Sequence, residues 1–72
     1  DKEELDLAGT LCTFLLDGEL SVTRTAELLY LHKNTVKYRL QRISDLLGFR
    51  PGKMPESMQL YRSAAIYRLL RS

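Results

Sequence analysis

The sequence predicts an all-α domain built from four helices, and three observations carry this prediction. Apolar residues recur with the helical period of about 3.6 residues, and the most regular series is Val36, Leu40, Ile43 and Leu47. No stretch alternates apolar and polar residues in the manner of a half-buried strand. The 72 residues are 44% apolar and 28% charged, a balance typical of a globular protein. We therefore expect residues 1–72 to form a single domain.

The first predicted helix covers about Glu4 to Leu16. One of its faces carries Leu5, Ala8, Cys12, Leu15 and Leu16, and a second stripe consists of Leu7, Leu11 and Phe14. Acidic residues in its first turn suit the positive end of the helix dipole. Gly18 is expected to end the helix, because glycine tolerates the left-handed cap conformation. Since apolar residues cover more than half of its circumference, this helix should contact more than one neighbour.

The second helix is predicted to be short, and the third is predicted to follow it within a few residues. Ser21 is expected to cap a helix from Val22 to about Tyr30. The third helix is predicted from about Lys33 to Leu47, with Gly48 as its C-terminal cap. The few residues left between the two form a tight turn, so the segment reads as a helix-turn-helix.

The last helix is predicted from about Pro55 to Leu70, because proline suits the first turn of a helix. Its inward face is expected to hold Met58, Tyr61, Ala65 and Leu69, and a second stripe holds Leu60, Ala64 and Tyr67. The arginines of this helix are expected to form a solvated face; they are Arg62, Arg68 and Arg71.

The second stripes of the first and last helices lead to a prediction about assembly. A chain of this length buries only about 60% of its unfolded surface, so its own core is small. We therefore expect these two stripes to help form a homodimer surface, the alternative being that they wrap around a single core. Dimers of helix-turn-helix domains bind DNA half-sites about 10 base pairs apart.

Composition excludes several classes of protein. No apolar run approaches the roughly 18 residues of a membrane-spanning helix, and we expect neither a signal peptide nor a membrane partner. With one cysteine and one histidine, the chain holds neither a disulfide framework nor a metal site of its own. No carboxylate pair, activated nucleophile or phosphate-binding loop indicates an enzyme, and no cofactor is expected.

Charge is segregated along the chain, although the net charge is only +2. Residues 1–20 hold one lysine against six acidic residues, a sum of −5. Residues 32–44 hold four cations and no acid, a sum of +4, and all four cations belong to the predicted third helix. A helix with one buried face and one cationic face suits the major groove of DNA. An acid in its first turns would instead be repelled by the phosphates.

The polar face of the third helix, with the residues around it, supplies the candidate DNA-binding set. Amides of Asn34 and Gln41 can pair with an adenine edge. Lys33 and Lys37 could read guanine or neutralise phosphates, and phosphate is the commoner partner. Hydroxyls and N–H groups at the start of the second helix can also meet a phosphate. The full set is Ser21, Thr23, His32, Lys33, Asn34, Thr35, Lys37, Tyr38, Gln41 and Arg42.

Several of these side chains also have structural readings. His32 and Thr35 could cap the third helix as well as meet a phosphate. Tyr38 could bind a phosphate through its hydroxyl or pack its ring over the second helix. Arg39 lies nearer the apolar stripe, so we expect a structural role, such as pairing with Glu27. Cys12 is expected to be a small core residue and not a reactive thiol.

The run His32-Lys33-Asn34-Thr35-Val36-Lys37-Tyr38-Arg39-Leu40 resembles the hallmark of the C-terminal helix-turn-helix domain of PucR/CdaR-type bacterial transcriptional regulators. That hallmark reads H-[RK]-N-T-V-x-Y-R-L and follows a helix with the pattern T-A-x-x-L, here Thr25 to Leu29. A more distant similarity is to the DNA-binding end of the Fis family. Tyr30 departs from the pattern, since helix-turn-helix motifs often place glycine there.

The resemblance implies a homeodomain-like or Fis-like three-helix core followed by a C-terminal helix. It implies sequence-specific binding of double-stranded operator DNA, with the third helix in the major groove. It further implies the output domain of a longer cytoplasmic regulator whose sensory domain lies upstream, and the missing initiator methionine agrees with such a fragment. The competing interpretation is a helical protein-interaction or dimerisation module whose basic face meets an acidic partner.

Overall fold

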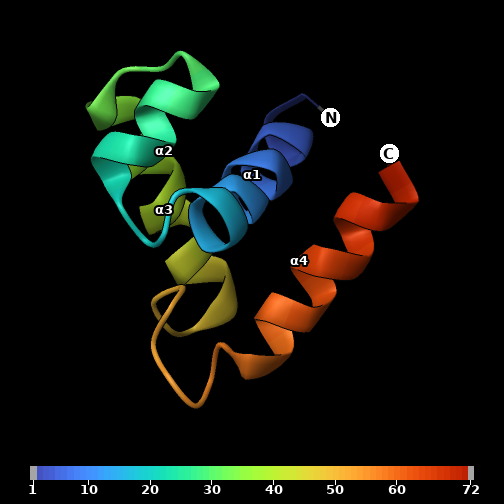
Figure 1. Ribbon diagram of the computed structural model, residues 1–72. Helices are drawn as coiled ribbons and strands as arrows, with labels where there is room; N and C mark the ends of the chain where they lie inside the picture. The colour runs from blue at the N-terminus through green and yellow to red at the C-terminus, as the bar shows by residue number, and fades with distance from the viewer. Residues whose placement is uncertain (1, 72) are drawn as a thin grey trace.

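The computed structural model describes the backbone of residues 2–71 and the side chains of residues 7–71. Within that range the chain forms α1 (Lys2–Cys12), a π-helical turn η1 (Thr13–Asp17), α2 (Val22–Leu29), α3 (Lys33–Leu47) and α4 (Met58–Arg71), and no strand (Figure 1). The predicted all-α class with four helices is confirmed. The side chains of Leu5 and of the acidic first turn of α1 lie outside the described residues.

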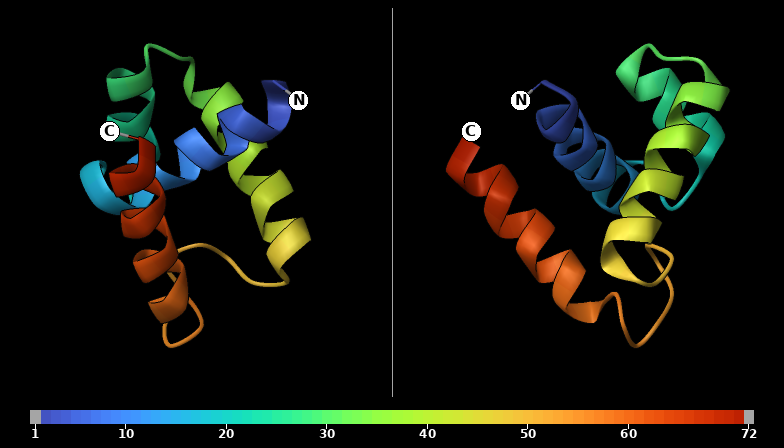
Figure 2. Two further views of the ribbon diagram at one scale, coloured as in Figure 1. Left: turned by 90° about the vertical axis from the view of Figure 1, so that its right-hand side faces the viewer. Right: turned by 180° about the vertical axis from the view of Figure 1, so that it is seen from behind.

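The continuous helix formed by α1 and η1 lies at the centre of the molecule. It is positioned between α4 on one side and α2 with α3 on the other (Figure 2). Buried residues occur on several of its faces; they are Leu7, Thr10, Cys12, Thr13, Phe14 and Leu15. The prediction that this helix contacts more than one neighbour is confirmed.

The end of this helix differs from the prediction. Gly18 is right-handed, with φ −88° and ψ −2°, and the left-handed conformations fall on Glu19 (φ 52°) and Leu20 (φ 63°). The N–H of Gly18 donates to the carbonyl of Thr13 at 2.7 Å, which closes the π turn. Glycine is needed here for a different reason, because a Cβ would lie 2.4 Å from Oγ1 of Thr25. Gly18 therefore permits close packing of η1 on α2.

The helix-turn-helix follows the predicted bounds closely. Oγ of Ser21 accepts a hydrogen bond from the N–H of Arg24 at 3.1 Å, so Ser21 caps α2 as predicted. Tyr30 ends α2 in the left-handed conformation, with φ 58° and ψ 42°, while its side chain is 94% exposed. A non-glycine residue in this conformation costs roughly 1 kcal/mol. The predicted bounds of α3 are confirmed, and Gly48 caps it with φ 85°.

The buried face of α3 fixes its orientation on α1. Val36 is fully buried and Ile43 is 5% exposed, whereas Leu40 is half-buried. Leu47 is 37% exposed, so the last turn of α3 lies outside the core. The buried part of the predicted apolar stripe therefore ends at Ile43 and does not include Leu47. The main core cluster is formed by Cys12, Phe14, Leu15 and Ala64.

α4 begins three residues later than predicted. Residues 53–57 form turns, closed by hydrogen bonds from the N–H of Ser57 to the carbonyl of Lys53 and from Met58 to Pro55. The carbonyl of Ser57 then accepts from the N–H of Tyr61 at 3.0 Å. Ser57 is therefore the residue that precedes the first helical position, and Pro55 belongs to the turn before it.

The buried face of α4 also differs from the prediction. Ala64 is buried, while Leu60, Tyr61 and Tyr67 are half-buried against the core cluster. Met58, Ala65 and Leu69 are exposed, so of the predicted inward face only Tyr61 contacts the core. The exposed large apolar side chains of α4 are Met58, Ile66, Leu69 and Leu70.

The two stripes assigned to a dimer surface lie within the core of one chain. Leu7, Phe14 and Ala64 are buried, and Leu11, Leu60 and Tyr67 pack against the core cluster. That surface assignment is therefore wrong, and the alternative of a single wrapped core is the one observed. The physical reason is that α4 lies directly against α1 and η1.

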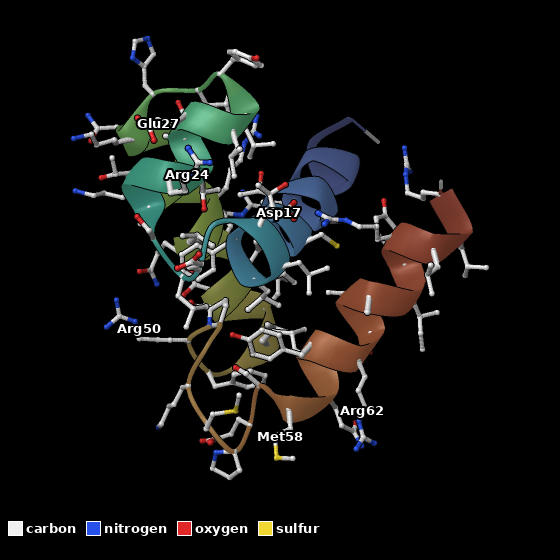
Figure 3. All side chains as sticks on the ribbon, viewed as in Figure 1. Asp17, Arg24, Glu27, Arg50, Met58 and Arg62 are labelled. Carbon is white, nitrogen blue, oxygen red and sulfur yellow. The ribbon has the colours of Figure 1, made fainter. Side chains whose placement is uncertain are left out.

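The arginines of α4 do not form one solvated face. Arg68 donates to both carboxylate oxygens of Asp17, at 2.8 and 2.7 Å, and so ties α4 to η1. The guanidinium of Arg71 lies 5.4 Å from the centroid of the Tyr67 ring and donates to its hydroxyl at 3.1 Å. Arg62 is exposed, on the outer side of α4 (Figure 3).

Candidate nucleic-acid interface

The outward face of α3 gathers six of the predicted site residues. Burial of Val36 and Ile43 turns the opposite side of the helix to solvent. The exposed side chains on that side are Lys33, Asn34, Lys37, Tyr38, Gln41 and Arg42. No carboxylate occurs on α3 before Asp45, so its first three turns present only cationic and neutral polar groups.

Two hydrogen bonds between side chains one helical turn apart organise the later part of this face. Nε2 of Gln41 donates to Oδ1 of Asp45 at 3.0 Å, and Nη1 of Arg42 donates to the hydroxyl of Tyr38 at 3.3 Å. Tyr38 is 57% exposed, and its hydroxyl is the acceptor of the bond from Arg42. The carbonyl oxygen of Gln41 keeps its capacity to accept a hydrogen bond from a base edge.

The earlier part of the face is electrostatically uncompensated. Lys33, Asn34 and Lys37 are exposed, and none of them has a hydrogen bond or ion pair with another side chain among residues 7–71. Unpaired ammonium groups on a rigid helix are suited to neutralising phosphates. Asn34 presents an amide with both donor and acceptor available.

The start of α3 only partly matches the prediction. His32 occupies the N-cap position, with φ −73° and ψ 148°, but its exposed imidazole makes no capping hydrogen bond. Its carbonyl accepts from the N–H groups of Thr35 and Val36, at 3.0 and 3.2 Å. Thr35 is half-buried inside the first turn and does not occupy the cap position. The backbone of His32 therefore begins the helix, while its imidazole ring makes no capping hydrogen bond to α3.

The start of α2 lies beside the face of α3. Val22 lines the same cleft as Lys37 and Gln41, a hollow of about 430 Å³. Thr23 is exposed at this end of α2, and the hydroxyl of Ser21 is engaged in the cap. Backbone N–H groups in the first turn of a helix have no partner within the helix and attract anions.

Arg39 has the structural role expected of it, with a different partner. Its Nη1 donates to Oγ1 of Thr10 at 3.2 Å, which joins α3 to α1. Glu27 pairs instead with Arg24, at 3.7 Å, and both lie on the outer surface of α2 (Figure 3). The cause is geometric: Glu27 and Arg24 are one helical turn apart on the same helix, whereas Arg39 faces α1.

Cys12 behaves as a core residue, as predicted. Its side chain is 7% exposed and its Sγ donates to the carbonyl of Ala64 at 3.7 Å. Burial raises the pKa of the Cys12 thiol, which disfavours the reactive thiolate. Within the described residues, no three His, Cys, Asp or Glu side chains gather in a metal-binding group. In the same range no helix is long and apolar enough to cross a bilayer.

Sequence reasoning missed one cation beside this face. Arg50, in the loop after α3, is exposed and lines the same cleft as Lys37. The charges of residues 45–56 cancel, so the segment gave no signal as a whole. The useful signal is position, because Arg50 follows the glycine cap of α3 by only two residues.

The chain is similar to known proteins over most of its length. Residues 7–66 match the family described as the PucR C-terminal helix-turn-helix domain. The purine catabolism regulatory protein of Bacillus subtilis (strain 168) is 38% identical over 63 residues, which cover 88% of this chain and 12% of that relative. The chain thus corresponds to about an eighth of the length of this relative. No solved structure matches the chain.

Proposed function

Because the chain belongs to the PucR C-terminal helix-turn-helix domain family, we propose that it binds double-stranded operator DNA with sequence specificity and places α3 in the major groove. The observation that carries this proposal is the outward face of α3, which is cationic, free of carboxylates in its first three turns and held rigid by buried Val36 and Ile43. A helix of this kind fits the major groove, where base edges are distinguishable.

We assign base reading to the two amides and phosphate binding to the other polar groups. Asn34 and Gln41 lie on the outward face, and an amide can bind the adenine edge through two hydrogen bonds. The phosphate-binding set is Ser21, Thr23, His32, Lys33, Thr35, Lys37, Tyr38 and Arg42. Support for this division is that half or more of the hydrogen bonds to DNA go to its backbone.

Selection of bound sites from a random DNA pool tests the proposal directly. The expected result is an enriched motif, together with an affinity that falls steeply with salt. For each phosphate contact, the binding constant should fall by about 0.9 logarithmic units per tenfold rise in salt concentration, and this dependence is the salt slope. A flat salt dependence without enrichment would refute DNA binding. It would favour the protein-interaction or dimerisation module, whose basic face on α3 would then meet an acidic partner.

We also propose that residues 1–72 are one domain of a longer cytoplasmic regulator with an upstream sensory domain, and that this domain has no catalytic role. The support is the relative from Bacillus subtilis, which is a regulatory protein by name and far longer than this chain. Expression of the isolated chain should give a cooperatively folding unit. Loss of folding without the rest of the protein would contradict the assignment of a self-contained domain.

A homodimer remains part of the proposal, on a different surface from the one first expected. Met58 and Leu69 are exposed on α4 and lie the same number of residues before and after the midpoint between Ser63 and Ala64. In an antiparallel pair of α4 helices, Met58 of each chain would therefore meet Leu69 of the other, as a two-fold interface requires. Sedimentation with and without DNA tests this. A monomer in both conditions, at micromolar concentration, would refute it.

A further inference from the structure

The cleft beside α3 contains charge that the predicted set of site residues does not account for. Its polar lining consists of Lys37, Gln41 and Ser44 of α3 and Arg50 of the following loop, above an apolar floor that includes Phe14 and Leu40. No carboxylate lines it. Two cations from different segments therefore border one hollow of about 430 Å³ with nothing to neutralise them.

Arg50 is exposed and has no ion pair or side-chain hydrogen bond within residues 7–71. Other cations nearby in sequence are differently placed: Lys53 pairs with Glu56 at 3.6 Å, and Arg42 donates to Tyr38. Figure 3 shows Arg50 on the side of the molecule away from α4, whereas Arg62 extends from the outer side of α4. Arg50 thus lies on the α3 side of the molecule.

The loop that carries Arg50 is fixed by three contacts. The N–H of Lys53 donates to the carbonyl of Arg50 at 3.0 Å, which closes a turn. Gly52 in this turn has φ +98°, and its N–H donates to Oγ of Ser57 at 2.7 Å. Ser57 is fully buried and Gly52 is half-buried, so this hydrogen bond is partly shielded from water.

Leu20 provides the third contact, from the segment before α2. A Cβ on Gly52 would lie 2.9 Å from Cδ2 of Leu20, so the backbone of the turn rests directly on that side chain. The turn is therefore held between the segment that enters α2 and the residue that precedes α4. Such a site is preorganised, and binding through Arg50 need not order a flexible loop.

We propose that Arg50 and Lys37 together bind a backbone phosphate of the DNA, at the edge of the groove that α3 enters. This inference rests on the proposed function, and it adds Arg50 to the interface as a residue that positions the domain on DNA of any sequence. A guanidinium offers a planar fork of donors that matches phosphate oxygens, and Lys37 adds a second charge from the helix itself. Ser57 and Gly52 act as positioning residues for Arg50.

The test compares Arg50→Gln with Lys53→Gln in DNA-binding titrations over a range of salt concentrations. Each substitution removes one positive charge from the same loop, but Lys53 is paired with Glu56 and does not line the cleft. R50Q should lower the salt slope by about one and weaken binding roughly five- to tenfold near 0.1 M salt, equally for selected and unrelated sequences. K53Q should retain the slope and affinity of the unmodified domain.

The outcomes separate this inference from the proposed function. If the unmodified domain does not bind DNA, the proposed function fails and the inference fails with it. If the domain binds DNA but R50Q behaves as the parent, or K53Q loses as much as R50Q, only the inference is overturned. Free inorganic phosphate provides a further arm. Competition by millimolar phosphate at constant ionic strength, equally strong in the parent and in R50Q, would show that the cleft is not the phosphate site.

The positioning role has its own readout. Ser57→Ala removes the acceptor that holds Gly52 and so should release Arg50 from its place. We expect the effect of R50Q on the salt slope to shrink towards zero in the S57A background, with circular dichroism confirming that the domain is folded. If R50Q lowers the slope by the same amount in both backgrounds, Ser57 stabilises the fold without positioning Arg50.

Discussion

Replacing Gly18 with alanine tests the contact that joins η1 to α2. The new Cβ would lie 2.4 Å from Oγ1 of Thr25 and 3.2 Å from the carbonyl oxygen of Thr13. Thr25 is fully buried and belongs to a regular helix, so it cannot turn into solvent to relieve the clash. Overpacking of this kind costs about 1–3 kcal/mol. For a domain of this size, each kcal/mol lowers the melting temperature by roughly 4–8 °C.

Gly9, inside α1, supplies a matched control for Gly18, which follows the end of η1. A Cβ on Gly9 would meet nothing within 4 Å, and the residue lies inside α1. Alanine is more stable than glycine in a helix interior by about 0.5–1 kcal/mol. Gly9→Ala and Gly18→Ala are thus the same chemical change with opposite expected signs.

Urea unfolding followed by circular dichroism gives the free energy of unfolding of each variant. The double variant Gly18→Ala with Thr25→Ala removes the clashing oxygen, so its loss should be smaller than the sum of the two single losses by 0.5 kcal/mol or more, a coupling typical of residues in contact. If Gly18→Ala is as stable as the parent, or if the two losses simply add, the close packing of η1 on α2 is not what requires glycine.

Further predictions concern the interface and the remaining stability determinants. Asn34→Ala should lower affinity for the selected site by about 1–3 kcal/mol and relax the preference at one base pair. Lys37→Gln should instead weaken binding to all sequences alike and lower the salt slope by about one. Competition titrations with permuted sites measure both effects, and unchanged affinity in the two variants would contradict the placement of α3 in the groove. Oγ1 of Thr25 is buried without a hydrogen-bond partner in the described structure, so Thr25→Val should raise the free energy of unfolding by up to about 1 kcal/mol, and a loss in urea unfolding would contradict this. The Arg68 guanidinium donates to Asp17 and holds the pKa of that carboxyl below its usual range. The pair therefore stabilises the fold above the ordinary carboxyl pKa and loses this effect as the pH falls through the lowered value. Asp17→Asn should remove the pH dependence of stability that this pair contributes. It should lower the free energy of unfolding by less than about 1 kcal/mol, since the pair is exposed. Melting curves that keep the parent's acid dependence would disprove this.

The helix-turn-helix could be predicted from sequence because its signals are local. The period of Val36, Leu40 and Ile43, the serine cap at Ser21 and the glycine cap at Gly48 each act within one or two turns of the chain. The structure reproduces all three. The outward face of α3 was predictable for the same reason, since the buried stripe of a helix determines which residues lie opposite to it.

The buried face of α4 could not be predicted because apolar residues surround most of that helix. Two stripes compete, and the period alone does not choose between them. The choice is made by contacts far apart in sequence. Ala64 is small enough for α4 to approach α1 closely, and Arg68 reaches Asp17 from the same side. The π turn of η1 likewise packs on α2, where Gly18 leaves room for Thr25.

The net charge of +2 gives little information about the interface until each charge is placed. Four acidic side chains have partners: Asp17 with Arg68, Glu27 with Arg24, Asp45 with Gln41 and Glu56 with Lys53. Three of these partners are cations that lie outside α3. Lys33 and Lys37 on α3, with Arg50 beside it, have no acidic partner among residues 7–71. Pairing therefore neutralises Arg24, Lys53 and Arg68 but not Lys33, Lys37 or Arg50, and the positive potential beside α3 would attract a polyanion.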